Sequence, residues 1–221
     1  MIDLRAFFRL RRLTFVEKHH EDGDLYTFSF KPSKPPVHTA GQHGLLFNPK
    51  LNVRVFSLAS APEEPYVMIG THIGSKSRYK NALMALRPGD KLTMLGPILN
   101  FTLPKNNVNV VFLAQGIGIT PFRSMLIHKK KQNIKTRVTL VHVANEPHTY
   151  RNITEDAADA AFYPTTPEDF TQTVKTVAQT EQIDTMYYLS GSPRFNRATK
   201  KTLLSLGIRR RSIKKDGFLG Y

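Results

Sequence analysis

Residues 108–121 read VNVVFLAQGIGITP, an apolar run of strand length that ends in a glycine turn and a proline. A solidly apolar run predicts a strand that is buried on both faces, as in a parallel sheet. The glycines let the backbone approach a ligand closely, and the helix expected over residues 121–131 offers unpaired N–H groups that favour phosphate. Taken alone, this glycine pattern is as consistent with a tight structural turn as with a ligand-binding turn.

A second turn of the same kind reads Leu189-Ser190-Gly191-Ser192-Pro193. It separates a strand expected at 186–189 from a helix expected at 194–206, and a further buried strand is expected at 138–143. Strands that alternate with helices predict a parallel α/β sheet, and two turns at the carboxyl ends of its strands predict a crevice site. The pair of turns therefore favours nucleotide binding.

Between residues 152 and 184 the pattern is weak: 157–161 is expected to be helical, and 170–177 alternates weakly.

The first half of the chain has a different rhythm. Its short apolar or alternating stretches are separated by Gly, Pro, Asn and Asp, which predicts closely spaced strands in an antiparallel barrel or sandwich. One helix is expected over 77–86, with Ser77 as its N-cap. We therefore predict an antiparallel β-barrel in residues 1–101 and an α/β parallel-sheet domain in residues 102–221. The strands expected in the barrel are 25–30, 44–47, 53–58, 66–69 and 91–95.

The composition narrows the chemistry. The chain has 221 residues, no cysteine and a formal net charge of +15. The lack of cysteine excludes disulfides, cysteine-held zinc or iron–sulfur clusters and cysteine nucleophiles, so redox chemistry needs an organic cofactor or another protein. The charge favours anionic partners. The histidines show no metal-ligand spacing, and neither a signal-peptide pattern nor a membrane-length apolar stretch is seen, so no metal and a cytoplasmic location are expected.

Together with the two turns, several short motifs resemble the ferredoxin–NADP reductase superfamily of FAD-binding oxidoreductases, in order and spacing and over nearly the whole chain. The resemblance implies a flavoprotein reductase that binds FAD and takes hydride from NAD(P)H. Electrons would then pass to a separate acceptor, either a ferredoxin-like or flavodoxin-like protein or a small molecule. The motifs are Arg54-Val55-Phe56-Ser57, Gly74-Ser75-Lys76-Ser77, Gly96-Pro97 with Phe101, Gly116-Ile117-Gly118-Ile119-Thr120-Pro121, Gly191-Ser192-Pro193 and Asp216-Gly217-Phe218-Leu219-Gly220-Tyr221.

On the flavin side, the resemblance implies a role for each motif residue. Arg54 would pair with the pyrophosphate, because a guanidinium fork suits phosphate oxygens. Phe56 would stack on the isoalloxazine ring, and the Ser57 hydroxyl would lie near flavin N5. The loop Gly74-Ser75-Lys76-Ser77 would receive the pyrophosphate on its backbone amides. Without the resemblance, residues 53–58 predict a plain strand with Phe56 in the core.

On the nicotinamide side, the resemblance implies that Ser190 stands where many relatives carry cysteine beside the ring. Asp216 would be the acidic residue that relatives place two positions before an aromatic, and Phe218 or Tyr221 would be the ring that covers the flavin. The catalytic set expected is therefore Ser57, Ser190, Asp216 and Phe218. The remaining nucleotide contacts expected are Gly116, Gly118, Ile119, Thr120, Pro121, Asn145 and Gly191.

Some positions depart from the family's pattern. Ala144-Asn145-Glu146 stands where many relatives carry a basic residue, and residues 150–184 contain no recognisable second basic segment. Since a 2′-phosphate then lacks cations, the sequence predicts either that NADH is used as readily as NADPH or that the nucleotide binds weakly. His43, in the family-like Gly41-Gln42-His43, is expected to be a hydrogen-bonded structural histidine.

Other classes of function stay open. Glu146 and Ser190 are compatible with a non-catalytic flavin or nucleotide-binding module. Arg5, Arg9, Arg11 and Arg12 with Phe7 and Phe8 could form the amphipathic surface of a membrane-associated flavin reductase. The basic surface would suit an acidic electron-carrier protein. Nucleic-acid binding rests on charge alone and is not expected, because no recognition helix or stacking motif is seen.

Overall fold

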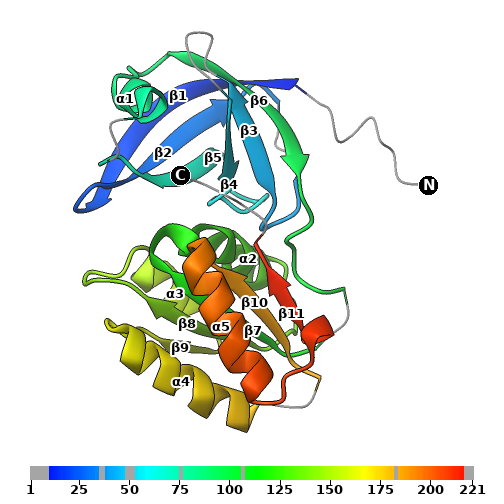
Figure 1. Cartoon of the computed structure of the whole chain (residues 1–221). Coiled ribbons are helices and arrows are strands. Elements are labelled where there is room, and N and C mark those ends of the chain that lie inside the picture. Colours follow the sequence, from blue (N-terminus) through cyan, green and yellow to red (C-terminus); the bar gives the residue numbers. More distant parts are fainter. Residues whose placement is uncertain are drawn as a thin grey trace.

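The computed structural model describes residues 10–34, 38–47, 53–74, 77–105, 108–181 and 184–216. Two domains lie one above the other (Figure 1), and each is built on its own sheet. The first is a curled six-stranded antiparallel sheet, and the second is a five-stranded parallel sheet with helices on both faces. Both predicted fold classes are confirmed.

The antiparallel sheet has the strand order β4-β3-β6-β1-β2-β5. An isolated bridge between Leu58 and Ile69 joins the two outer strands, so that the sheet curls back on itself. A core of aromatic and aliphatic side chains, Phe15, Phe28 and Phe30 among them, fills the inside. The elements are β1 (Leu10–Asp22), β2 (Leu25–Pro32), β3 (His43–Phe47), β4 (Arg54–Ser57), β5 (Val67–His72), α1 (Arg78–Met84) and β6 (Lys91–Ile98).

Two features of this domain differ from the sequence-based expectations. Strand β1 was not predicted, because only Leu13 and Phe15 mark its inner face strongly while its second half is exposed and charged. Ser77 does stand at the N-cap position of α1, but its side chain makes no capping hydrogen bond. The expected capping role of that hydroxyl is therefore wrong.

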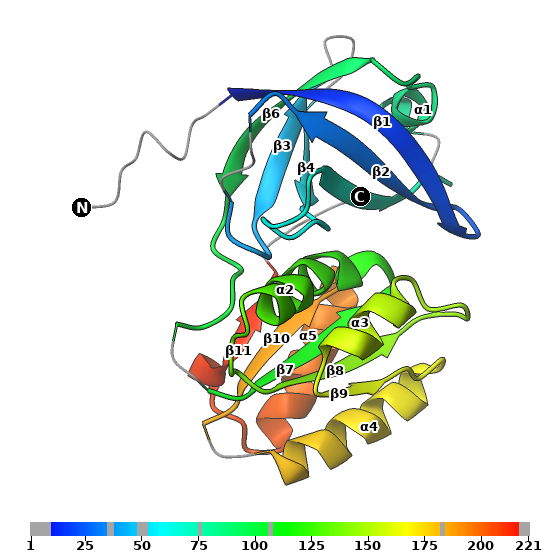
Figure 2. The ribbon, with the colours of Figure 1, turned by 180° about the vertical axis from the view of Figure 1, so that it is seen from behind.

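The parallel sheet has the strand order β11-β10-β7-β8-β9. Helices α4 and α5 cover one face, and α2 and α3 cover the other (Figure 2). The strands are β7 (Val110–Gln115), β8 (Val138–Val143), β9 (Ala160–Phe162), β10 (Met186–Ser190) and β11 (Ile213–Lys215). The helices are η2 (Gly116–Ile119), α2 (Thr120–Lys131), α3 (Arg151–Ala157), α4 (Pro167–Thr180), α5 (Pro193–Ser205) and η3 (Arg210–Ser212).

Strand β7 shows why the central strand reads as solidly apolar. Its alternate side chains point to opposite faces of the sheet. Phe112 packs on Phe122 of α2, with ring centroids 4.3 Å apart, whereas Val111 and Leu113 belong to the core shared with α4 and α5. Both faces are covered, so neither can be polar.

The weakly patterned stretch contains two elements that the sequence did not predict correctly. The helix expected over 157–161 is wrong beyond its first residue, because α3 ends at Ala157 and β9 begins at Ala160. The weak alternation over 170–177 lies in the fourteen-residue helix α4. Threonines, which have low helix propensity, weaken the helical pattern in the sequence. The spacing of the buried residues is nevertheless helical: Phe170, Val174 and Val177.

The two domains are held together by buried polar contacts. Arg123 of α2 makes two hydrogen bonds of 2.9 Å with the Glu64 carboxylate and one of 2.7 Å with the Ala59 carbonyl oxygen. Ser124 donates to the Ser60 carbonyl oxygen at 2.7 Å.

The predicted domain boundary after residue 101 falls in the segment between β6 and β7 and stays a prediction. Among the described residues, no helix combines the length and apolar character needed to cross a membrane.

Candidate functional site

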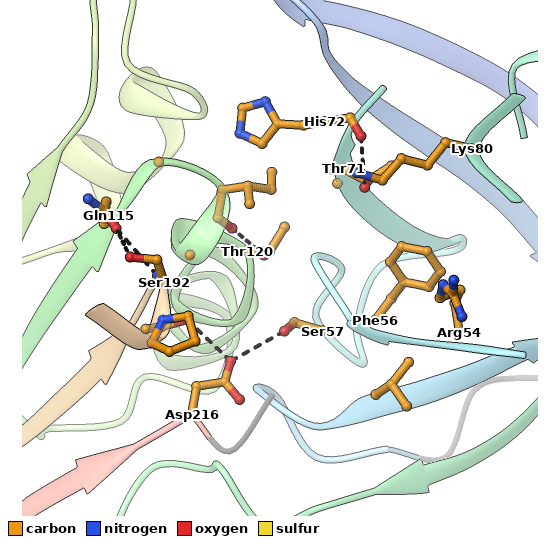
Figure 3. Close-up of a pocket in the computed structure, with 18 of the residues that line it drawn as sticks. Arg54, Phe56, Ser57, Thr71, His72, Lys80, Gln115, Thr120, Ser192 and Asp216 are labelled. Carbon is orange, nitrogen blue, oxygen red and sulfur yellow. Dashed lines mark hydrogen bonds between the residues drawn. The ribbon is translucent and has the colours of Figure 1, made fainter. Parts of the chain in front are cut away.

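A cleft of about 390 Å³ lies between the two domains. Its lower wall is the carboxyl edge of the parallel sheet between β7 and β10, where the chain changes the direction in which it adds strands. Open α/β sheets bind ligands at this kind of switch point. Its upper wall comes from β4, β5 and α1 of the barrel (Figure 3). The predicted crevice is present, and the barrel closes it from above.

Strand β4 supplies the predicted flavin-side residues to the cleft. Arg54, Phe56 and Ser57 all line it. The Phe56 ring is largely buried and lies 5.8 Å from the ring of Tyr79, which also lines the cleft. Burial raises the pKa of Tyr79, so its hydroxyl stays protonated and donates to the Leu46 carbonyl oxygen at 3.1 Å. The upper wall thus combines two aromatic rings with an exposed guanidinium.

The upper wall also includes His72 of β5 and Lys80 of α1, neither of which is in the predicted set of site residues. Asp24 accepts from His72 Nδ1 at 2.6 Å and from the Gly74 backbone N–H at 2.8 Å. That amide, expected to face a pyrophosphate, is therefore bonded to a carboxylate. Neither Gly74 nor Ser77 is among the residues lining the cleft, and the expected contacts Ser75 and Lys76 lie outside the described residues.

The lower wall is built on two glycine turns that touch each other. A Cβ added to Gly118 would lie 2.2 Å from the Ser190 carbonyl oxygen. Gly116 has a φ of +50° and faces open space. The Gln115 amide oxygen accepts from the Ser192 hydroxyl at 2.8 Å, which ties the two turns together across the cleft edge (Figure 3).

Most of the predicted nucleotide contacts meet in the cleft. Gly116, Gly118, Thr120 and Gly191 line it, as does Ser190. The structure does not bring Ile119, Pro121 and Asn145 into the lining of the cleft. Ile119 is fully buried in the core below the turn, Pro121 is buried at the start of α2, and Asn145 is exposed beyond β8.

A hydrogen-bonded group joins the two walls at the base of the cleft. Asp216 accepts from Ser57 at 3.4 Å and from Ser190 at 3.2 Å. His43 lies behind them, with Nε2 2.9 Å from one Asp216 oxygen and 3.1 Å from the Ser57 hydroxyl. The histidine is completely buried and hydrogen-bonded. Phe218 and Tyr221, the expected covering rings, lie outside the described residues.

In this arrangement one hydroxyl group from each domain donates a hydrogen bond to the same carboxylate. Because carboxylate oxygens only accept, Asp216 orients the Ser57 and Ser190 hydroxyls and ties one wall to the other. Among the described residues, no three potential metal-ligating side chains cluster. The cleft therefore fits an organic ring system with an anionic chain: aromatic flanks and hydroxyls for the ring, and Arg54, Lys80 and backbone amides for the phosphates.

A second cavity, of about 420 Å³, extends from the same turn and was not predicted. It lies between α4 and α5 and shares Gln115 with the main cleft. Phe170 and Phe195 line it, with ring centroids 5.1 Å apart, and the cation Arg194 stands in its lining. The sequence signal for this groove was the apolar face of α4, which was not identified as a helix.

Known proteins share this architecture, although no family model matches the chain. A ferredoxin–NADP⁺ reductase from Neisseria gonorrhoeae with bound FAD and NADP superimposes with a TM-score of 0.75 at 19% identity, covering 96% of this chain and 100% of that one. The ferredoxin reductase of carbazole 1,9a-dioxygenase gives a TM-score of 0.81 at 19% identity, over 96% of this chain and 70% of that one. The chain therefore has the fold of these ferredoxin reductases, and the predicted resemblance is confirmed at the level of the fold.

In sequence, the chain is similar to the F component of the Na⁺-translocating NADH-quinone reductase of Neisseria meningitidis. The two are 26% identical over 238 aligned residues, which cover 92% of this chain and 55% of the relative. The chain thus spans about half the length of the curated relatives that it matches.

Proposed function

We propose that the chain is an FAD-dependent oxidoreductase that takes hydride from NADH or NADPH and passes the electrons to a separate acceptor. The observation that carries this proposal is the convergence of Arg54, Phe56 and Ser57 with the two glycine turns on one cleft. The relatives support it, since one is described with bound FAD and NADP and another as a component of an NADH-quinone reductase.

The chain's own part in this reaction is positioning. Hydride transfer needs the donor carbon and the acceptor nitrogen about 3–3.5 Å apart, with aligned orbitals. The flavin, when bound, supplies the hydride acceptor and the one-electron steps that follow. Phe56 would hold the ring, Arg54 and Lys80 would hold the phosphates, and Ser57 and Ser190 would approach the reacting atoms from opposite walls.

The cavity between α4 and α5 could hold the adenosine half of the nicotinamide dinucleotide. A dinucleotide with its nicotinamide at Ser190 would pass over the phosphate-favouring turn and Gln115 and lay its adenine between α4 and α5. Beside this path, Glu146 follows β8, and its carboxylate lies 3.4 Å from the Arg151 guanidinium. A 2′-phosphate directed to that edge would meet a carboxylate and an already paired cation, whereas one directed into the groove would meet Arg194. We therefore propose that NADH is used as readily as NADPH.

Anaerobic reduction of the bound flavin tests the proposal. The purified protein is loaded with FAD and mixed with NADH or NADPH in the absence of oxygen. Bleaching of the visible flavin absorption is expected. A yellow protein that never bleaches would favour a binding module, and a protein that does not hold flavin would contradict both. Acid release of the flavin, followed by chromatography, distinguishes FAD from FMN.

A matched pair of serine substitutions locates the reaction. Ser57→Ala removes the hydroxyl that joins the upper wall to Asp216, and we expect bleaching to slow about tenfold or more, as for the loss of one hydrogen bond to a charged group. Ser205→Ala, at the far end of α5, is expected to leave the rate unchanged. Equal rates for both variants would contradict the role of Ser57.

An acidic carrier is the acceptor that the surface charge favours. The cations between the start of α5 and the end of β11 have no ion-pair partner among the described residues, whereas Lys129 and Lys130 are paired with Asp159 and Asp156. Unpaired positive charge steers acidic proteins at long range, and salt screens this steering. Reduction of a flavodoxin should therefore slow as salt is added, while reduction of a neutral quinone should not. Flavodoxin reduction that is independent of salt would contradict the proposal. The cations concerned are Arg194, Arg197, Lys200, Lys201, Arg209, Arg210, Arg211, Lys214 and Lys215.

A further inference from the structure

A buried histidine lies directly beneath the glycine turn. His142 is the fifth residue of β8, is completely buried, and has Nε2 2.9 Å from the Gly116 carbonyl oxygen. A carbonyl oxygen can only accept, so Nε2 carries the hydrogen and donates it. Burial lowers the pKa of His142 to about 4, which keeps the ring neutral at physiological pH. Its other nitrogen, Nδ1, is buried and makes no hydrogen bond within the described residues.

The hydrogen bond fixes the direction of one peptide group. In a planar trans peptide the C=O and the following N–H point in opposite directions. Holding the Gly116 carbonyl toward His142 and β8 therefore directs the Ile117 N–H away from β8. Gly116, with a φ of +50°, has no side chain to resist rotation of this peptide. A short 3₁₀ helix such as η2 has hydrogen bonds of poor geometry, so contacts from outside add to its stability.

The next peptide is held in the same way from the other side. The Thr120 hydroxyl donates to the Ile117 carbonyl oxygen at 2.6 Å, which directs the Gly118 N–H in the opposite direction. Two successive carbonyls of the turn are thus each bonded to a side chain, one from β8 and one from α2. Gly116, Ile117 and Gly118 all line the cleft.

We propose that His142 is a positioning residue for nucleotide binding, which holds the Gly116–Ile117 peptide so that its amide presents a hydrogen-bond donor to the pyrophosphate. The inference rests on the proposed function, because it concerns the same turn. Without the histidine the peptide can rotate and present its carbonyl oxygen, which repels an anion. A residue that no ligand touches would then control affinity.

His148 provides a matched control within the same cluster. Its ring lies 5.2 Å from that of His142 in an edge-to-face arrangement. It is also buried, but its Nε2 bonds to the Pro164 carbonyl oxygen at 3.1 Å, and its Nδ1 lies 3.2 Å from Glu146. Among the described residues, His148 makes no hydrogen bond to the glycine turn at residues 116–119. Its loss should therefore affect packing and leave the turn in place.

Binding of ADP-ribose to the flavin-loaded protein, measured by calorimetry, tests the proposal. His142→Leu removes the donor, and His142→Asn has an amide too short to reach the Gly116 oxygen. Both are expected to weaken ADP-ribose binding about ten- to a hundredfold, the effect of losing a hydrogen bond to a charged group. His142→Gln places its amide nitrogen near the position of Nε2 and should restore most of the affinity. In steady state, KM for NADH should rise in the Leu and Asn variants while kcat changes little.

Several outcomes would overturn the proposal. One is a His142→Asn protein that binds ADP-ribose as tightly as His142→Gln, and another is a His148→Leu protein that loses as much affinity as the His142 variants. Flavin content and melting temperature are recorded for every variant, and the Gln and Asn pair carries the test even if His142→Leu does not fold. If wild-type protein binds no ADP-ribose, the proposed function fails as well. If wild type binds and the variants match it, only this inference fails.

Discussion

The upper and lower walls of the cleft recognise ligands by different means. The upper wall presents side chains from a short strand and a short helix: Arg54, Phe56, Ser57 and Lys80. The lower wall presents backbone, since its turns are built from Gly116, Gly118 and Gly191, and its side chains mainly hold peptides in place. The upper wall is therefore sensitive to the removal of a side chain, and the lower wall is sensitive to the addition of one.

Because of this difference, we expect substitutions in the two walls to have different effects on stability. A strand such as β4 keeps its backbone hydrogen bonds whatever its side chains are, so losing Arg54 should cost ligand affinity and little stability. The touching turns have no spare space, because a Cβ on Gly118 would meet the Ser190 backbone. Substitutions there should disturb ligand binding and folding together.

The largest effect is expected from separating the walls. Arg123→Ala removes the guanidinium that binds Glu64 and the Ala59 carbonyl, and it leaves a largely buried carboxylate without its cation. We expect a loss of about 3–5 kcal/mol in the free energy of unfolding, measured by urea denaturation. Lys130→Ala, which breaks an exposed pair with Asp156, should cost about 1 kcal/mol or less. Similar losses in the two variants would show that Arg123 does not join the domains.

A glycine pair tests the backbone character of the lower wall. Gly118→Ala should cost about 3 kcal/mol in unfolding free energy, near the upper end for overpacking, and should abolish measurable NADH binding. Gly116→Ala faces open space and meets only the penalty of its positive φ, about 1–2 kcal/mol. Thermal melting and NADH titration of both variants make the comparison. If Gly116→Ala proves the more harmful, the close contact between the turns is not what matters.

The pH dependence of stability tests the buried histidine of the lower wall. Burial lowers the pKa of His142 from 6.5 to about 4. Between these values the unfolded chain takes up a proton that the folded chain does not, so stability falls as pH drops from about 6.5 toward 4, by up to about 3 kcal/mol. Above about pH 6.5 His142 is neutral in both the folded and the unfolded chain, so the full stability is present there. Urea denaturation at a series of pH values should give a flatter acid slope for His142→Gln than for wild type, and parallel slopes would contradict the assignment.

The upper wall is tested by the removal of one cation. Arg54→Ala should weaken FAD binding by about 1.5–3 kcal/mol, the value of hydrogen bonds to a charged group, and should leave the melting temperature of the flavin-free protein unchanged. Arg78→Ala, on the exposed side of α1, is the control and should bind FAD like wild type. Flavin fluorescence titration measures both. A large fall in the melting temperature of flavin-free Arg54→Ala would show that the strand depends on this side chain.

The sequence predicted the lower wall more directly than the upper one. Glycine turns between a solid apolar strand and a helix have a local signature, so Gly116 and Gly191 were placed from their own surroundings. Arg54, Phe56 and Ser57 look like an ordinary strand, and only the resemblance to a family set them apart. The motif predicts a ligand contact for Ile119, but its side chain is fully buried in the core.

What the sequence did not predict depends on contacts between distant segments. His43, Ser57, Ser190 and Asp216 come from both domains and meet only after folding, and no local pattern marks His43 as part of that group. The α4–α5 groove was missed because threonines concealed the helix. His142 looks like one apolar-strand position among six, and its role follows from the 2.9 Å contact with the Gly116 oxygen.

A crystal structure of the chain with FAD and a non-oxidisable NADH analogue, which cannot donate hydride, tests the central claim most directly. The account predicts the isoalloxazine ring against Phe56 and Ser57, the nicotinamide ring beside Ser190, and their reacting atoms about 3–3.5 Å apart. Flavin and nucleotide bound on separate faces, or either ligand outside the cleft between the domains, would contradict it.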